Sequence, residues 1–228
     1  MACQKSPTSL KEGALFVSDV HYHPGFREEF LEVVDGWIAQ PPPQIFLMGD
    51  IFDLLVGSVP ATHGPNRPLI ERLGRLSALT ECHYFEGNHD FDLRPIFGDM
   101  RIYPRECQPA FFAAGERRAA LLHGDIAAGP GYELYTRAIR HPLTLRLLSL
   151  LNVGGWITRR IQRYNAQKRL CKKILGFKPR KIPGADLVIE GHYHQDIITP
   201  HYINLPAFGC DGSVVEYRGG EFVKRKMR

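Results

Sequence analysis

Five short segments of this 228-residue chain combine a turn with side chains that bind metal ions. Each segment follows an apolar run and carries carboxylate, imidazole or amide groups. In chain order they are Asp19-Val20-His21, Gly49-Asp50-Ile51-Phe52-Asp53, Gly87-Asn88-His89-Asp90, His123-Gly124-Asp125 and Gly191-His192-Tyr193-His194. Glycine lets a backbone turn sharply where a neighbouring side chain must face a ligand. One such segment is an ordinary turn, but five in this order indicate a shared site.

The donor types of these segments predict which ions would bind. Oxygen and nitrogen donors without a thiolate favour a divalent ion such as Mn²⁺, Fe²⁺ or Zn²⁺. Two such ions need a shared carboxylate to offset their charge, and Asp50 is the candidate bridge. The five cysteines are scattered and form no CxxC pair. They argue against a thiolate zinc site and a disulfide framework, and they favour a reducing compartment.

Short apolar strands are expected to position these segments. Runs at 14–18, 45–48 and 83–85 alternate with helical patterns at 26–38 and 69–79, which predicts parallel β-α-β units. Ligands bind beyond the carboxyl ends of such strands, where Asp19, Asp50 and Asn88 follow. Six further strands are predicted. Two form a hairpin at 110–114 and 119–122, one lies at 187–189, and three lie in the carboxyl-terminal part at 201–204, 213–217 and 222–224.

The net charge of +5 conceals a strong asymmetry. Residues 127–181 contain 13 Lys and Arg but one acidic residue, a net charge of +12, so the remainder carries −7. Within this segment apolar residues recur every three or four positions, which predicts an amphipathic helix: Leu150, Val153, Ile157, Ile161 and Tyr164. We expect one domain over residues 1–228, with 127–181 as a basic helical lid inserted into it.

The amino-terminal residues lack the apolar run of a signal peptide. No stretch approaches the roughly 18–20 apolar residues of a membrane-spanning helix. These features predict a cytoplasmic protein and leave peripheral contact with a membrane open.

The ordered motifs SDVH, GDIFD, GNHD, HGD and GHYH resemble those of the calcineurin-like metallophosphoesterases, over residues 14 to about 196. The resemblance implies an α/β fold, a four-layer α-β-β-α sandwich, with a dinuclear metal centre. It also implies how two groups of ligands and a bridge hold the ions: Asp19, His21 and His194 for one ion, Asn88, His123 and His192 for the other, and Asp50 between them.

The same resemblance implies a hydrolytic mechanism without a covalent nucleophile. Two bound ions would lower the pKa of a water, and the resulting hydroxide would attack phosphorus. His89 would face the phosphate and protonate the leaving oxygen or stabilise its charge, and Asp90 would orient His89. Asp53 would hold a loop or a metal ligand in place without binding an ion itself.

The basic segment has three interpretations. It could be a solvated helical surface, or it could bind nucleic acid through its cations. Its few aromatic residues are not interleaved as a stacking platform, which does not favour nucleic acid. It could instead cover a substrate that has apolar and anionic parts. Leu143 to Leu151 would then meet acyl chains, and the basic face would meet phosphates or an anionic membrane surface.

The third interpretation resembles a subfamily that hydrolyses the pyrophosphate bond of UDP-2,3-diacylglucosamine in lipid A biosynthesis, releasing UMP and 2,3-diacylglucosamine 1-phosphate (lipid X). This resemblance implies Mn²⁺ as the ion and a peripheral position on the inner face of the inner membrane. It also implies that the UDP-linked acylated glucosamine head group contacts Asn88, Tyr132, Asn165 and Lys168.

One departure keeps other functions open. Well-known members of the subfamily carry Arg after the Asn of GNxD, whereas this chain has His89, whose charge titrates. A general metallophosphodiesterase or nuclease with a different phosphoester is therefore the alternative. A catalytically silent metal-binding scaffold is a further possibility, although the complete set of seven ligands argues against it.

Overall fold

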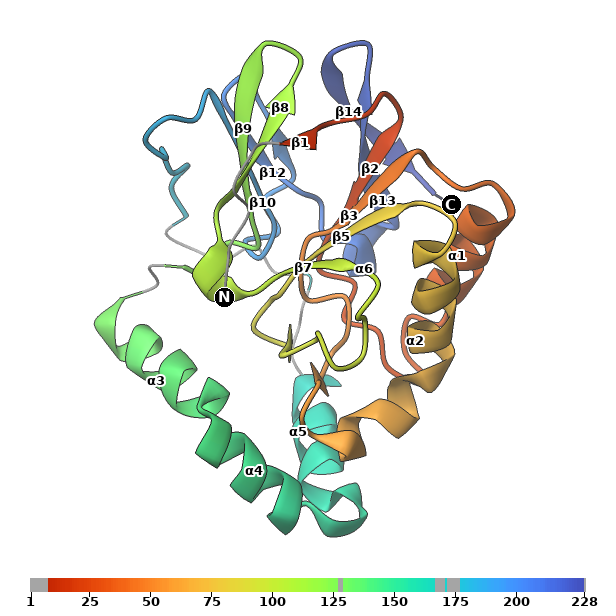
Figure 1. The fold of residues 1–228 in the computed structure, drawn as a ribbon, viewed down its shortest axis with the longest axis vertical. Helices are drawn as coiled ribbons and strands as arrows, with labels where there is room; N and C mark the ends of the chain where they lie inside the picture. The colour runs from red at the N-terminus through yellow and green to blue at the C-terminus, as the bar shows by residue number, and fades with distance from the viewer. Residues whose placement is uncertain (1–7, 127–128, 167–170, 172–176, 228) are drawn as a thin grey trace.

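The computed structural model describes residues 8–126, 129–166, 171 and 177–227 (Figure 1). Two six-stranded sheets lie face to face, and two helices cover the outer face of one of them. This arrangement confirms the predicted α/β sandwich.

The first sheet carries the amino-terminal half of the site. Four neighbouring strands, ending at the edge strand β7, are parallel: β2 (Ala14–Val17), β3 (Gln44–Leu47), β5 (Glu81–Phe85) and β7 (Arg101–Tyr103). Its other edge is an antiparallel pair, β13 (Ser213–Arg218) and β14 (Glu221–Lys226). Helices α1 (Glu29–Ala39) and α2 (His63–Ser77) connect the parallel strands, so the predicted β-α-β rhythm is confirmed.

The second sheet carries the remaining ligand segments. Its strand order is β1-β8-β9-β10-β12-β11, with these bounds: β1 (Thr8–Ser9), β8 (Ala110–Ala114), β9 (Arg117–Leu122), β10 (Leu187–Glu190), β11 (Ile197–Ile198) and β12 (Tyr202–Asn204). Strands β8 and β9 form the predicted hairpin, whereas β9 and β10 are parallel neighbours. Their carboxyl ends lead directly into the segments of His123 and His192.

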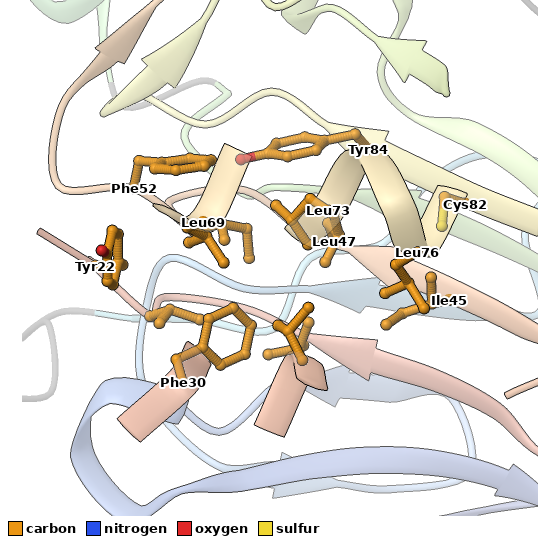
Figure 2. Close-up of a cluster of buried hydrophobic side chains, with 14 of the residues drawn as sticks. Tyr22, Phe30, Ile45, Leu47, Phe52, Leu69, Leu73, Leu76, Cys82 and Tyr84 are labelled. Atoms are coloured by element: carbon orange, nitrogen blue, oxygen red, sulfur yellow. The ribbon is translucent and has the colours of Figure 1, made fainter. Parts of the chain in front are cut away.

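Two apolar cores hold the layers together. Aromatic residues fill the space between the sheets, where Phe16 and Phe46 stack with ring centroids 4.5 Å apart. The second core lies between the first sheet and its helices. Figure 2 shows Leu69 and Leu73 of α2 and Leu47 of β3 in this core. On the outer face of the second sheet, the described covering residues belong to the segment 177–182 rather than to a helix.

Short elements complete the rim of the site: β4 (Leu55–Val56), β6 (Asp90–Phe91), η1 (Pro60–Thr62), η2 (Arg105–Cys107) and α6 (Phe208–Asp211). Strands β4 and β6 pair with each other apart from the two large sheets. They bring the backbone after Asp53 beside the backbone after His89.

The basic insertion, residues 127–181, contains four helical elements among its described residues: α3 (Pro130–Arg140), α4 (Pro142–Leu151), η3 (Val153–Gly155) and α5 (Trp156–Ala166). In Figure 1, α3 and α4 extend away from the sheets, and α5 lies below them. The single helix predicted across residues 150–164 is wrong. Gly154 and Gly155 adopt φ values of 64° and 72°, and Asn152 caps α5 through the amide of Ile157 at 3.0 Å.

The expectation of no disulfide is also wrong, so the cysteines no longer indicate a reducing compartment. Cys171, at the end of the insertion, forms a disulfide with Cys210 of α6. Their sulfur atoms come from segments 39 residues apart, so no local pattern reveals the pair. Cys82 is a free, buried thiol, as expected of a core residue. No helix within the described residues has the length and apolar character needed to cross a membrane.

Candidate metal centre

The structure brings all five ligand-bearing segments together at the carboxyl ends of both sheets. Ligand atoms within 4.8 Å of one another form three groups: Asp19, His21 and His194; Asp50, His123 and His192; His21, Asp53 and His89. The first two groups match the two predicted ligand sets, with Asn88 adjacent to the second. His21 belongs to the first and third groups, so these two groups lie beside each other.

The first group is built around a buried carboxylate. Oδ1 of Asp19 lies 3.2 Å from Nε2 of His194, and its other oxygen accepts hydrogen bonds from the hydroxyl of Ser18 and, at 2.9 Å, from the amide of His192. Nδ1 of His21 is buried and has no hydrogen-bond partner among the described residues. A buried nitrogen without a partner is costly, and a bound cation would satisfy it.

The second group is oriented by a backbone contact. Nδ1 of His123 donates to the carbonyl of Met48 at 2.9 Å, which directs Nε2 towards the centre. Nε2 then lies 3.5 Å from Oδ2 of Asp50 and 3.4 Å from Oδ1 of Asn88. A histidine that donates one nitrogen to a carbonyl presents the other as a metal ligand, so these three side chains converge on one cation position.

Backbone strain is concentrated at the ligands. Non-glycine residues rarely adopt a positive φ, yet five of the seven predicted ligands do so. The φ angles lie between 52° and 64° at Asp19, His21, Asp50, His192 and His194. Such strain persists where the surrounding structure fixes it and is common at functional sites. The left-handed turns at the strand ends aim these side chains into one space.

Two glycines allow the ligand loops to approach one another. A Cβ at Gly87 would overlap the carboxylate of Asp50, and a Cβ at Gly191 would overlap the hydroxyl of Ser18. Each glycine immediately precedes a predicted ligand. Glycine is needed at both positions because the neighbouring loop leaves no room for a Cβ, and not for its backbone conformation, since neither φ is positive.

Electrostatics keep most ligands ready to bind a cation. Burial lowers the pKa of His21 to about 3 and that of His192 to about 4, so both imidazoles are neutral. Burial would raise the pKa of Asp19, but hydrogen bonding and charge from His194 lower it to about 2. For His123 the Asp50 carboxylate outweighs burial and raises the pKa.

The predicted catalytic pair is placed differently from expectation. Nδ1 of His89 lies 2.7 Å from the carbonyl oxygen of Asp53 and 4.0 Å from its carboxylate. The carboxylate of Asp90 instead accepts hydrogen bonds from the amides of Ile51 and Phe52 at 2.7 and 3.2 Å and from the hydroxyl of Tyr84 at 2.6 Å. Asp53 therefore orients His89, while Asp90 anchors the loop that carries Asp50.

The predicted substrate-binding residues of the insertion have different positions. Tyr132 is half-buried in α3, and burial together with the carboxylates of Asp125 and Asp50 raises the pKa of its hydroxyl. Asn165 of α5 is buried, and its Nδ2 lies 3.3 Å from both the carbonyl and carboxylate oxygens of Asp53. Lys168 lies outside the described residues.

Sequence reasoning missed three arginines that contact the ligand loops. Arg105 contacts Asp125, Arg140 contacts Gly87, and Arg180 contacts Gly124. The contacting residues are 20 to 56 positions apart in sequence. Isolated arginines carry no motif, so only the folded arrangement reveals these contacts.

Buried oxygen and nitrogen donors thus converge at the strand ends of an α/β sandwich, in an arrangement that could hold divalent metal ions. A model of the calcineurin-like phosphoesterase family matches residues 14–196, and the chain belongs to this family. Members use a dinuclear divalent metal centre, and the residues described above fit one. The protein is therefore a metal-dependent hydrolase.

The chain is also similar to curated proteins named UDP-2,3-diacylglucosamine hydrolase. The protein from Pseudomonas savastanoi pv. phaseolicola is 26% identical over 200 residues, which cover 81% of this chain and 80% of that protein. The protein from Neisseria meningitidis serogroup C is 25% identical over 205 residues, with 81% and 83% covered. The structure of nuclease MPE from Pseudomonas putida gives a TM-score of 0.44 at 15% identity, covering 93% and 87%.

Proposed function

We propose that this protein hydrolyses the pyrophosphate bond of UDP-2,3-diacylglucosamine, releasing UMP and 2,3-diacylglucosamine 1-phosphate. One observation carries the proposal: an exposed apolar helix adjoins the candidate metal ligands. Leu145 of α4 packs against Val56 and Phe91 at the rim of the site, which fixes the helix there. Relatives with the corresponding name support the choice of substrate.

The metal ligands are proposed as Asp19, His21 and His194 for one ion and Asn88, His123 and His192 for the other, with Asp50 shared. Mixed oxygen and imidazole donors suit Mn²⁺, with Fe²⁺ and Zn²⁺ as alternatives. When bound, two such ions activate a water and neutralise phosphoryl oxygens.

His89 is proposed to act on the leaving group. Its Nδ1 is held by the carbonyl of Asp53, so Nε2 is the nitrogen that remains for the substrate. In the imidazolium form, Nε2 can donate a proton to the leaving oxygen. Asn165 holds Asp53 from α5, which makes it a positioning residue in this proposal rather than a direct substrate contact.

The insertion is proposed as the lid that binds the lipid part of the substrate. Four leucines of α4 are 56–74% exposed and recur at helical spacing on one face: Leu143, Leu147, Leu150 and Leu151. Exposed apolar side chains of this number in a soluble domain indicate a binding surface. Acyl chains are the ligands that match them.

Cations beside these leucines are proposed to place the protein at a membrane. Arg146, Arg159, Arg160 and Arg163 are exposed on α4 and α5. A basic, apolar helical surface binds the interface of an anionic bilayer. We propose a cytoplasmic protein held peripherally on the inner face of the inner membrane, where a diacylated substrate would reside.

His89 favours one alternative function. The subfamily motif has arginine at this position, so a general metallophosphodiesterase or nuclease acting on another phosphoester is the second candidate. Its expected signature is cleavage of simple aryl phosphodiesters or nucleic acid, with a steep salt dependence for the latter.

The test is UMP release from UDP-2,3-diacylglucosamine by the purified protein, measured separately with Mn²⁺, Mg²⁺ and Zn²⁺. We expect release that EDTA and Asp50→Ala abolish and that Asp99→Ala, in an exposed loop, leaves unchanged. Cleavage of bis(p-nitrophenyl) phosphate with the lipid substrate untouched would establish the alternative instead.

A further inference from the structure

Three arginines, Arg105, Arg140 and Arg180, connect the insertion to the loops around one of the two predicted ions. Those loops carry Asn88, His123 and His192, the three side chains assigned to that ion besides the shared Asp50. Each arginine makes several contacts to a loop, and each is largely shielded from solvent, with 13–22% of its side chain exposed. Guanidinium groups suit this task, because their donors diverge in a fixed plane.

Arg180 links the two histidine loops. Its guanidinium donates to the carbonyl oxygens of Gly124 and Ile126, at 2.8 and 3.1 Å. It also forms an ion pair of 2.8 Å with fully buried Glu190. Gly124 follows His123, and Glu190 precedes Gly191 and His192, so one side chain from the end of the insertion fixes the spacing of both loops.

Arg140 links the last residue of α3 to the asparagine loop. Its Nη2 donates to the carbonyl oxygen of Gly87 at 2.6 Å, and Nη1 lies 3.4 Å from the buried carboxylate of Glu86. The guanidinium carbon lies 4.6 Å from the ring centroid of Phe91. Because Gly87 immediately precedes Asn88, this contact joins the end of α3 to that ligand.

Arg105 completes the set from the body of the protein. Its Nε donates to fully buried Asp125 at 3.1 Å, two residues beyond His123, and its Nη1 donates to Glu133 of α3 at 2.9 Å. One side chain thus bridges the histidine loop and the first turn of the insertion.

We infer that Arg105, Arg140 and Arg180 are positioning residues for the ion assigned to Asn88, His123 and His192, and that they couple its affinity to the placement of the insertion. The inference rests on the proposed ligand assignment. Two ligands of the first ion, Asp19 and His21, instead follow β2, and Ser18 supports Asp19 through a hydrogen bond. The two ions should therefore respond unequally when an arginine is lost.

The experiment is a Mn²⁺ titration of the full chain. Equilibrium dialysis measures the affinity for each ion, and electron paramagnetic resonance distinguishes one bound ion from two. The variants are Arg140→Met and Arg180→Met, which keep the aliphatic stem, and Arg180→Lys, which keeps the charge. We expect affinity for one Mn²⁺ to fall about 10–100-fold while the other changes less than twofold. The exchange-coupled signal of the wild type should give way to a six-line mononuclear signal.

Two reference variants make the result specific. Arg137→Met, exposed and one turn before Arg140 on α3, should bind two ions like the wild type. His192→Ala should lose the same ion that the arginine variants lose. Unequal loss supports the inference, whereas equal loss at both sites, or unchanged binding, overturns it. If the wild type binds fewer than two ions, the proposed metal centre fails instead.

A second measurement separates coupling from a merely structural role. Coupling is reciprocal, so Mn²⁺ should slow amide hydrogen exchange in α3, residues 130–140. This protection should be present in the wild type and in Arg137→Met, and it should be absent in Arg140→Met. Equal protection in all three proteins would contradict the inference.

Discussion

His89 illustrates what a single side chain contributes at this centre. Its Nδ1 contacts a backbone carbonyl, and its ring centroid lies 4.8 Å from that of the predicted ligand His21. We expect His89→Ala to lower kcat by about 10²-fold or more, as for loss of a general acid, with Mn²⁺ stoichiometry unchanged. Steady-state kinetics and dialysis on the same preparation test this. Loss of bound Mn²⁺ would show instead that His89 acts as a ligand.

Asp90 has a different role from its neighbour in the motif. It is fully buried and accepts hydrogen bonds from the amides of Ile51 and Phe52. Asp90→Ala would leave these donors buried and unpaired, so we expect the free energy of unfolding to fall by roughly 3 kcal/mol or more. Urea denaturation measures it. Asp92→Ala, whose carboxylate bonds an exposed amide, should cost under about 1 kcal/mol.

The individual ligands were predictable from sequence because each belongs to a compact motif. Asp19 and His194 converge as the motif order implies. The contacts of Asp53 with His89 and Asn165 were not predictable, since two of the three residues are 112 positions apart. Local patterns reveal which residues can bind metal, and long-range packing determines what holds them.

At the scale of elements, apolar runs located nine strands within one or two residues, because buried strands are rich in apolar residues. The short strands β1, β4, β6, β7 and β11 were not predicted. Helix boundaries were less predictable. Helix α2 begins at His63, six residues before the predicted start, where the sequence is rich in glycine and proline. A histidine contact to the carbonyl of Val56 at 3.1 Å stabilises this first turn. Glycine and proline at these positions are more typical of a loop.

Strand β5 contains a buried histidine that predicts a pH dependence of stability. Burial lowers the pKa of His83 to about 4, whereas an unfolded histidine has a pKa of about 6.5. Between these values the unfolded chain binds more protons, so stability is lost as pH falls from about 6.5 towards 4. The contribution lost between pH 7.5 and 5 is about 2 kcal/mol.

Urea denaturation at both pH values, with EDTA present, tests this expectation. His83→Gln should destabilise at pH 7.5 but lose less stability than the wild type on acidification. His201→Gln, on an exposed histidine, should behave like the wild type. Identical pH dependence in His83→Gln and the wild type would exclude His83 as the source.

Helix α4 predicts a response to lipid. Leu147→Asp places a charge on its exposed apolar face, so we expect the KM for the diacylated substrate to rise about tenfold or more. Hydrolysis of a small aryl phosphodiester should change little. Leu79→Asp is the matched control, because Leu79 is 54% exposed against 56% for Leu147 and lies at the end of α2. Equal effects from both variants would remove α4 from lipid binding.

At the scale of the molecule, the structure shows where the acidic and basic parts of the chain lie. The acidic body holds buried Asp19, Asp50, Asp90 and Asp125 around one space, whereas the cations of the insertion lie beside it. Removing metal ions leaves these carboxylates with less compensation. We expect EDTA to abolish activity and lower Tm by about 5–10 °C, the effect of a ligand present at roughly 100 times its Kd. Differential scanning calorimetry with Mn²⁺ restored checks reversibility.

The parallel pairing of β9 with β10 has a topological consequence. A chain that leaves one strand must return to the opposite end of the sheet before it can form a parallel neighbour, which takes about a dozen residues. The residues between Leu122 and Leu187 form this crossover connection. The entropic cost of closing a loop grows only logarithmically with its length. This connection can therefore lengthen without disturbing any strand pair. Substrate preference can thus diversify in one crossover while the hydrolytic chemistry stays unchanged.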